Sequence, residues 1–368
     1  MSKSVFTSES VCAGHPDKVC DQISDAIVDA ALEADPNARV AVEALVTLNQ
    51  IVLAGEVTAN AEIDFEAIAR REIKRIGYTE PKWGFSDQSA LVGYIHAQSA
   101  EIAVGVDDSG AGDQGMMFGY ACRDTAEFMP LPIALAHALV AEIDELRESK
   151  KLAYLRPDGK AQVSIEYQDG KPIAVQNVVL AVPHDEETSL EQVKTDLYNE
   201  AVVRVLAKYD LSIDTKDLVC NGTGVWHNPG PASDTGLTGR KIIVDSYGGF
   251  ARVGGGAFSG KDPSKVDRSG AYAARFLAKN IVAAGLADKV EVALAYFIGA
   301  KKPVMQEYET FGTAKAAPSE ISAFADKLLD TSVTGIIEGL NLRRPIYLNA
   351  AAYGHFGRSE FPWEKLIS

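Results

Sequence analysis

Cysteine, metal-ligand patterns and targeting segments are scarce in this sequence. The 368 residues include only four cysteines, and no two of them form a Cys-x-x-Cys pair. This excludes a disulfide scaffold and predicts reduced thiols that are buried or partly buried. The six histidines lack the spacing of transition-metal ligands. No basic–apolar–small signal pattern begins the sequence, and its most apolar stretch, 128–141, is too short to span a bilayer. We therefore expect a cytoplasmic protein with no membrane partner.

Positive charge is also in short supply. The chain has 36 lysines and arginines against 51 aspartates and glutamates, a formal net charge of −15. This balance argues against binding nucleic acid or an anionic membrane surface. Residues 238–268 are an exception, because six basic and three acidic side chains give them a local charge of +3. A focused basic segment in an acidic chain suits a small polyanion.

The basic segment contains a glycine-rich run, 254–260, that is followed by Lys261 and Lys265. Glycines leave backbone N–H groups open to an anion, and the N-terminus of the helix expected next would favour phosphate. The run nearly matches the Walker A pattern, but Asp262 stands where Ser or Thr should hold magnesium. Residues 249–253 also lack the pattern of a buried strand. We predict a polyphosphate cradle that is not a P-loop; a glycine-rich turn that caps a helix is the alternative.

Residues 14–18 (GHPDK) lie at the front of another expected helix. His15 on a Gly-Pro turn can bond phosphate, and Asp17 offers hard oxygens to a divalent metal. The alternative is a turn histidine beside a carboxylate that balances the helix dipole.

Residues 110–115 (GAGDQG) fit the dinucleotide pattern G-x-G-x-x-G. However, no good strand precedes them, Gly119 would interrupt the helix that should follow, and no acidic residue stands at the distance of a ribose partner. We therefore reject a Rossmann fold and predict a mobile, gating active-site loop at 99–115.

Two further segments combine cations with turn residues. Asp158 and Lys160 lie in a turn before an expected strand, and Arg240 and Lys241 follow two glycines before a strand expected at 242–245. Both arrangements suit phosphate binding, with surface turns as the alternative.

Two carboxylates, Glu43 and Glu56, lie on an expected hairpin of otherwise apolar strands. Since unpaired burial of a carboxylate is costly, these residues need a partner or a function. Solvent-facing strand positions are the alternative.

The order helix–strand–strand–helix occurs three times, starting near residues 21, 132 and 268. The expected helices are 21–34, 65–76, 132–148, 190–208, 268–287 and 319–329. The expected strands are 39–48, 51–58, 161–167, 173–182, 290–298 and 304–310. We predict an α/β fold of the α+β type, built of three pseudo-threefold-related subdomains. Each should be a mixed or antiparallel sheet with helices on one side. The expected boundaries are 1–100, 110–229 and 230–368.

Together these stretches closely resemble the methionine adenosyltransferase, or S-adenosylmethionine synthetase, family, and the resemblance covers essentially the whole chain. The most specific motifs are GAGDQG at 110–115 and GGGAFSGKDPSKVDRS at 254–269. GHPDK at 14–18, LRPD at 155–158 and GLTGRKIIVD at 236–245 support them.

The resemblance implies three pseudo-symmetric α/β subdomains, in agreement with the repeat. It also implies a transferase in which methionine sulfur attacks C5′ of ATP and expels triphosphate, which is then hydrolysed to phosphate and diphosphate. The implied cofactors are Mg²⁺, with two ions expected, and K⁺. The implied partners are ATP, L-methionine and a second copy of the chain, in a homodimer with interfacial active sites that assembles into a homotetramer.

Site roles follow from the matching motif positions. The resemblance implies that the catalytic residues are His15, Asp113, Lys160, Arg240, Lys261 and Lys265. It implies that ATP is bound by His15, Asp158, Lys160, Trp226, Asp234, Arg240, Lys241, Ala257 and Lys261. It implies that methionine is bound by Glu56, Gln98, Asp234 and Lys265. It implies that Asp17 and Asp267 bind magnesium and that Glu43 binds potassium.

The sequence departs from the family pattern in three places. Val225 stands where an arginine is usual, Thr47-Leu48-Asn49 replaces a common Lys-Thr-Gly, and the loop between Asp107 and Gly110 is shorter than in many relatives. Two other readings remain open. A non-catalytic, adenosylmethionine-binding regulator is suggested by Val225, but the retained His15, Asp17, Lys261, Lys265 and Asp267 argue against it. A P-loop kinase or ATPase is disfavoured by Asp262 and by the missing buried strand.

Overall fold

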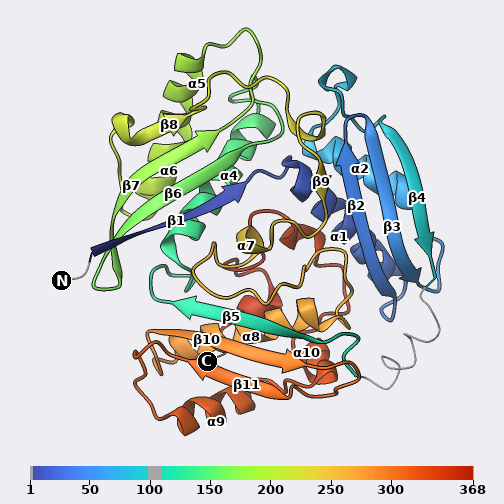
Figure 1. Cartoon of the computed structure of the whole chain (residues 1–368), viewed down its shortest axis with the longest axis vertical. Helices are drawn as coiled ribbons and strands as arrows, with labels where there is room; N and C mark the ends of the chain where they lie inside the picture. Colours follow the sequence, from blue (N-terminus) through green and yellow to red (C-terminus); the bar gives the residue numbers. More distant parts are fainter. Residues whose placement is uncertain (1–2, 98–109, 368) are drawn as a thin grey trace.

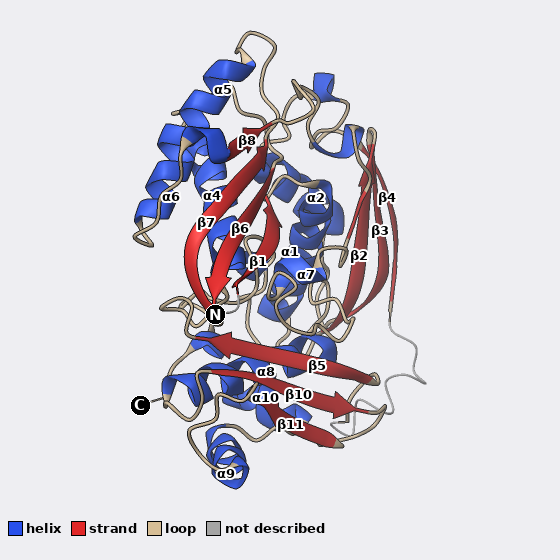
Figure 2. Ribbon diagram, turned by 60° about the vertical axis from the view of Figure 1, so that its left-hand side comes forward, coloured by secondary structure: helices blue, strands red, loops and turns tan. Residues whose placement is uncertain are grey.

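In each of the three predicted helix–strand–strand–helix units, the two strands pair as an antiparallel hairpin and the helices pack against the resulting sheet. The computed structural model describes residues 3–97 and 110–367, and Figure 1 shows three sheets arranged around central helices. In the first sheet the strand order is β4-β3-β2-β9. Its strands are β2 (Arg39–Thr47), β3 (Gln50–Thr58), β4 (Ala90–His96) and β9 (Gly236–Leu237). Helices α1 (Pro16–Ala34) and α2 (Phe65–Ile76) lie on its inner side. Figure 2 shows that the other face of this sheet points away from the rest of the protein.

The second sheet has the order β1-β6-β7-β8. Its strands are β1 (Lys3–Val11), β6 (Lys160–Gln168), β7 (Lys171–Ala181) and β8 (Leu218–Cys220). Its helices are α4 (Leu131–Glu148), α5 (Leu190–Leu197) and α6 (Val203–Ala207). A π-helical turn, Tyr198–Val202, joins the last two, so the helix predicted over 190–208 is interrupted. The turn between β6 and β7 has positive φ at Asp169 and Gly170, as hairpin turns require.

The third sheet has the order β11-β10-β5. Its strands are β5 (Gly115–Cys122), β10 (Lys289–Tyr296) and β11 (Met305–Glu309). Its helices are α8 (Val266–Ala283), α9 (Pro318–Leu328) and α10 (Val333–Gly339). Short 3₁₀ turns complete the chain at Pro81–Trp83, Thr215–Asp217, Gly230–Ala232, Leu348–Ala350 and Pro362–Glu364.

Each hairpin pairs with a strand from a distant part of the chain. β2 pairs antiparallel with β9, β6 with β1, and β10 with β5. An isolated hairpin is marginally stable, and the added strand widens the surface that the helices cover. These exchanges join the three units into one body; the subdomain boundaries given above stay a prediction.

The predicted fold class is confirmed, and so are the three repeats of helix, two strands and helix. The strand predicted at 242–245 is wrong, because these residues form the short helix α7 (Ile242–Asp245). A four-residue apolar run cannot by its pattern distinguish a strand from a buried helical turn. The strand before 110–115 in the chain is β4, which ends at His96, so it does not lead directly into the glycine motif. The rejection of a Rossmann fold still holds, because the segment after the glycines is the strand β5 and not a helix.

Helices α1 and α8 lie at the centre of the molecule and contribute to one continuous apolar cluster. A second cluster lies between α4 and the β6–β7 hairpin. All four cysteines are free and buried, as predicted. In the described ranges, no helix has both the length and the apolar character needed to cross a membrane.

Candidate active site

One edge of β2 organises the candidate site. Near its end, Leu45 and Val46 pair with β9, and near its start Ala41 bridges to Lys261. The basic loops that follow β9 and precede α8 are therefore held along the same edge, with α1 packed beside it. Strand pairing thus brings together cations that lie about twenty residues apart in the sequence.

His15 is the N-cap of α1 and is buried. Its Nδ1 accepts the backbone N–H of Asp17 at 3.2 Å, so the proton of the neutral ring belongs on Nε2. Burial, with further contributions from Lys241 and Lys160, lowers the pKa of His15 to about 3. At neutral pH His15 is therefore an uncharged hydrogen-bond donor.

Asp17 is surrounded by groups that stabilise its charge. One carboxylate oxygen accepts from the Lys241 ammonium, and the other accepts the Leu237 N–H at 3.0 Å. Arg240 Nε lies 3.6 Å from the same carboxylate. Burial alone would raise the pKa of Asp17, but the bonds from Lys241 and Leu237 outweigh it and lower the pKa. Asp17, Arg240 and Lys241 therefore form one charged cluster beside His15.

The glycine-rich loop is fixed to β2 by backbone pairing. Gly260 O accepts from Val42 N, and Asp262 N donates to Val40 O. Gly260 has φ +82°, and a Cβ there would lie 2.0 Å from Val42 O, so the close approach needs glycine. The Gly260 N–H donates to Asp25 at 2.9 Å, so this amide is not available to a phosphate.

Asp262 explains the departure from Walker A. Its carboxylate is buried and accepts the N–H groups of Val40 at 2.7 Å and Ser264 at 2.9 Å, and it pairs with Lys265. Lys265 and these N–H groups lower its pKa, although burial acts to raise it. Asp262 is thus an anchor of the loop, and Lys261 separately donates to Asp267 at 2.7 Å.

A cavity of about 290 Å³ lies where this loop meets the first sheet. Predicted site residues line it, namely Glu43, Glu56, Ala257 and Lys261. Thr238 from the other basic loop also lines it, so the cavity adjoins the cluster around Asp17. Glu56 lies 3.5 Å from the ring of His96 at the end of β4.

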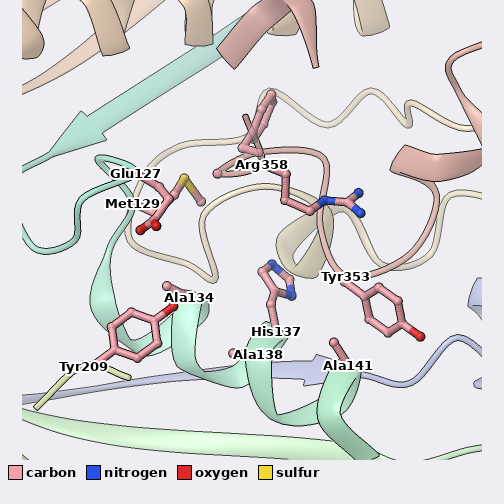
Figure 3. A pocket seen from close by; sticks show the side chains of 11 residues that line it. Glu127, Met129, Ala134, His137, Ala138, Ala141, Tyr209, Tyr353 and Arg358 are labelled. Carbon is pink, nitrogen blue, oxygen red and sulfur yellow. The ribbon is translucent and has the colours of Figure 1, made fainter. Parts of the chain in front are cut away.

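A larger cavity, of about 380 Å³, lies elsewhere, between α4 and the segment 353–358 (Figure 3). His137 and Arg358 line this cavity. Met129 and Phe356 also line it and contribute to its largely apolar surface. Burial lowers the pKa of His137 to about 3. Its Nε2 is fully covered and has no hydrogen-bond partner within the described part of the chain. None of the predicted site residues lines this cavity, so size alone does not locate the site.

Three more predicted residues lie on the second-sheet side. Asp158 is buried and accepts the N–H groups of Gly159 at 2.7 Å and Gly230 at 2.8 Å. Burial raises its pKa to about 7 despite these bonds. Lys160 begins β6 with an exposed side chain, close enough to His15 to affect its pKa. Trp226 donates its indole N–H to Asn228 O at 2.7 Å.

The remaining predicted residues are more exposed or outside the described ranges. Asp234 is exposed at the end of the 3₁₀ turn 230–232. Asp113 is exposed and accepts the N–H of Gln114 at 2.7 Å. Gln98 and most of the predicted loop 99–115 lie outside the described residues.

Asp17 and Asp267 are the carboxylates predicted to hold magnesium. Among residues 3–97 and 110–367 there is no group of three or more His, Cys, Asp or Glu side chains that could hold a metal. Asp17 and Asp267 each offer hard oxygens, although each already pairs with a lysine. Mg²⁺ commonly takes one or two carboxylates and completes its shell with phosphate oxygens and water. These carboxylates fit such a shared site, but not an all-protein cage.

Sequence reasoning missed the buried charges behind the site. Lys18 lies between Asp21 and Asp245, and Arg268 pairs with Asp25. The signal was visible in the sequence, because aspartates recur every four residues along α1.

Three family models match consecutive parts of the chain. They describe the N-terminal domain (residues 3–100), the central domain (108–226) and the C-terminal domain (229–365) of S-adenosylmethionine synthetase. Among similar curated proteins, the S-adenosylmethionine synthases of Clostridium acetobutylicum, Clostridium tetani and Clostridium botulinum are 53%, 51% and 49% identical to the chain. Each comparison covers 99% of this chain and 97% of the relative.

Proposed function

The chain belongs to the S-adenosylmethionine synthetase family, and we propose that it is a methionine adenosyltransferase that makes S-adenosylmethionine from ATP and L-methionine. The observation that carries the proposal is the meeting of cations from two loops along one edge of β2. Arg240 and Lys241 come from the loop after β9, and Lys261 and Lys265 come from the loop before α8.

The chemistry needs no protein nucleophile, because the methionine sulfur attacks C5′ of ATP itself. Catalysis then rests on aligning sulfur with C5′ and on stabilising the charge that develops on the leaving triphosphate. The cations Arg240, Lys241 and Lys261 suit that charge. His15, held neutral by its surroundings, donates Nε2–H to an oxygen near the broken bond. Triphosphate is then hydrolysed to phosphate and diphosphate in the same site.

The other predicted residues bind methionine and the rest of the nucleotide in this proposal. Lys265 pairs with the methionine carboxylate, and Glu56 and Asp234 contact the amino group, with Gln98 as a further contact. Asp113 places negative charge near the forming sulfonium. The remaining nucleotide contacts are Asp158, Lys160, Trp226 and Ala257. These roles rest on the matching motif positions, and the cavity lined by Glu56, Ala257 and Lys261 supports them.

Asp17 and Asp267 would hold two Mg²⁺ ions together with the phosphates, and Glu43 would contribute to a K⁺ site. Magnesium, when bound, supplies positive charge to the phosphate oxygens. The chain's own part is to offer these carboxylates while Lys241 and Lys261 move from them to the phosphates. Both lysines are only partly buried, which leaves room for that exchange.

We also propose a homodimer with active sites at the interface, assembling into a homotetramer. The outer face of the first sheet supports this, because Val92 and Tyr94 are exposed there beside the cavity strands β2 and β3. A second copy of the chain on this face would cover these side chains and close the cavity. We expect no nucleic-acid partner, in keeping with the acidic net charge.

The test is an incubation of the protein with ATP, methionine, magnesium and potassium, with the products separated by chromatography. The proposal predicts S-adenosylmethionine with equal amounts of phosphate and diphosphate. Folded protein that binds S-adenosylmethionine but makes none would favour a regulator. Release of ADP without methionine would favour a P-loop ATPase.

A further inference from the structure

Helix α1 carries four aspartates at four-residue spacing: Asp17, Asp21, Asp25 and Asp29. This spacing places them on one face of the helix. Like charges four residues apart repel each other, and a buried carboxylate without a partner is costly. Such a row is therefore stable only if every member has partners from elsewhere.

Each aspartate of this row accepts a backbone N–H from a residue far away in the sequence. Asp17 accepts from Leu237 at 3.0 Å and Asp21 from Gly239 at 2.8 Å. Asp25 accepts from Gly260 at 2.9 Å, and Asp29 accepts from residues 347 and 348 at 2.9 Å. Leu237 ends β9, and Gly239 and Gly260 belong to the two basic loops of the candidate site. One face of α1 therefore holds both loops through its aspartates, while β2 holds them through backbone pairing.

Asp25 makes the strongest of these connections. Its side chain is fully buried, and its two oxygens accept from the two terminal nitrogens of Arg268 at 2.7 and 2.6 Å. A bidentate pair of this kind fixes orientation as well as charge. Arg268 is equally buried, lies 4.2 Å above the ring of Tyr347 and donates to Tyr272 at 3.1 Å.

The same pair holds the glycine-rich loop at two consecutive residues. Asp25 takes the N–H of Gly260, and Arg268 donates to the backbone oxygen of Lys261 at 2.9 Å. The backbone on both sides of the Lys261 Cα is thereby tied to α1 and α8. Lys265 starts from the same loop, one turn before Arg268, at the N-cap of α8. The positions of both lysines thus depend on a salt bridge that lines no part of the candidate cavity.

We propose that Asp25 is a positioning residue for the transferase reaction: with Arg268 it fixes the glycine-rich loop so that Lys261 and Lys265 meet the substrates. This rests on the proposed function, which assigns those lysines to the triphosphate and the methionine carboxylate. Asp25 acts through the loop, because both of its oxygens are already occupied by Arg268 and the Gly260 N–H and it lines no part of the candidate cavity. Displacing an aligned catalytic group by 1 Å can lower a rate ~10²-fold.

The first variant is Asp25→Asn, which keeps the shape of the side chain and removes its charge. We expect kcat to fall ~10²-fold, since the loop loses its bidentate anchor, with a smaller change in the KM for methionine. Because this variant leaves Arg268 buried without its counter-charge, it can also lose stability. The second variant, Asp25→Asn/Arg268→Gln, removes both charges and should recover stability without recovering kcat.

A matched control is the ion pair of Arg275, which lies on α8 like Arg268. Arg275 and Glu364 are also fully buried and bidentate, at 2.8 and 2.9 Å, and Glu364 also accepts from Lys279. Arg275 donates its remaining bonds to residues 120, 127 and 128, none of which belongs to the basic loops. Arg275→Gln/Glu364→Gln should therefore shift the unfolding midpoint at least as much as the Asp25 double variant and leave kcat within a factor of two or so, measured well below that midpoint.

Four outcomes decide the matter. A low kcat in the stable Asp25 double variant, with a normal kcat in the control, supports the positioning role. A normal kcat in the Asp25 double variant overturns it and leaves only a structural salt bridge, and an equal loss of kcat in both double variants does the same. An unaltered chain that is folded and yet makes no S-adenosylmethionine contradicts the proposed function itself, which separates that failure from a failure of the positioning role.

Discussion

The candidate site and the interior behind it contain two sets of ion pairs between a lysine or arginine and an aspartate. The two sets differ in how far their cations are exposed. In the outer set, Lys241, Lys261 and Lys265 are 18–26% exposed and pair with Asp17, Asp267 and Asp262. In the inner set, defined by the pairs Lys18–Asp21 and Arg268–Asp25, no side chain exceeds 1% exposure. The outer cations can therefore reach an anion from solvent, and the inner ones cannot.

The difference in burial implies a difference in energetics and in role. Only Lys261–Asp267 has both side chains partly exposed, and such a pair typically contributes below ~1 kcal/mol, so a phosphate can replace its carboxylate at small cost. Asp17 and Asp262 are buried, and they keep backbone N–H donors when their lysines turn to a phosphate or carboxylate. Removing one member of a buried pair costs ~3–5 kcal/mol, because a charge is left without a partner in the interior. We infer that the outer pairs open when substrate binds and that the inner pairs persist and hold the loops. The following predictions test this contrast, from the largest expected effect to the smallest.

Lys18→Met should lower the free energy of unfolding by ~3–5 kcal/mol, because Asp21 and Asp245 lose the ammonium between them. Urea unfolding at pH 7 measures the change. Lys82→Met is the matched control, since its side chain is 72% exposed and the expected change is below ~0.5 kcal/mol. A loss below ~1 kcal/mol for Lys18→Met would contradict the inner role.

Lys261→Ala should reduce kcat/KM roughly 10²-fold, which corresponds to an activation free energy raised by ~3 kcal/mol. The reason is that one oriented cation is lost from the triphosphate. The free energy of unfolding should change by less than ~1 kcal/mol, since the Lys261–Asp267 pair is partly exposed. Steady-state kinetics and urea unfolding of the same preparation measure both. Full activity in the variant would remove Lys261 from the site.

His15 should make stability depend on pH. Burial and the cations Lys241 and Lys160 lower its pKa to about 3, whereas the unfolded chain titrates near 6.5. The unfolded state therefore binds the extra proton between these values, and stability falls as pH falls, by about 1.4 kcal/mol per pH unit from this group. His15→Asn should reduce the slope of unfolding free energy against pH by that amount between pH 4.5 and 6. An unchanged slope would mean that His15 is charged in the folded protein.

Val225→Arg should have the smallest effect. Val225 is 61% exposed in the loop before β9, so an arginine can be accommodated without repacking. We expect stability within ~0.5 kcal/mol of the parent and a KM for ATP lowered a few-fold, because one exposed charge contributes below ~1 kcal/mol. An unchanged or raised KM would indicate that this loop does not face the nucleotide.

The parts of the fold that were predicted correctly have strong local patterns. The apolar faces of α1, α2 and α8 and the hairpins β2–β3 and β6–β7 could be identified from periodicity and turn residues. β1 and β9 could not, because one is largely polar and the other has two residues, and both exist through pairing with distant strands.

The candidate site shows the same division. The loops that bear Arg240, Lys241 and Lys261 were recognisable as motifs, and the structure places them together on β2. The four-residue spacing of aspartates on α1 was visible, but its meaning depended on which amides the fold brings to that face. The strand predicted at 242–245 failed for the same reason, since only tertiary packing decides between strand and helix there.

The contrast between outer and inner pairs is tested most directly by a crystal structure with a non-hydrolysable ATP analogue, magnesium and methionine. The account predicts that Lys241, Lys261 and Lys265 leave their aspartates for the phosphates and the methionine carboxylate. The Arg268–Asp25 distances should stay at 2.6 and 2.7 Å and the Lys18–Asp21 distance at 2.9 Å. Outer pairs that remain closed with the nucleotide bound elsewhere, or an inner pair that opens, would contradict it.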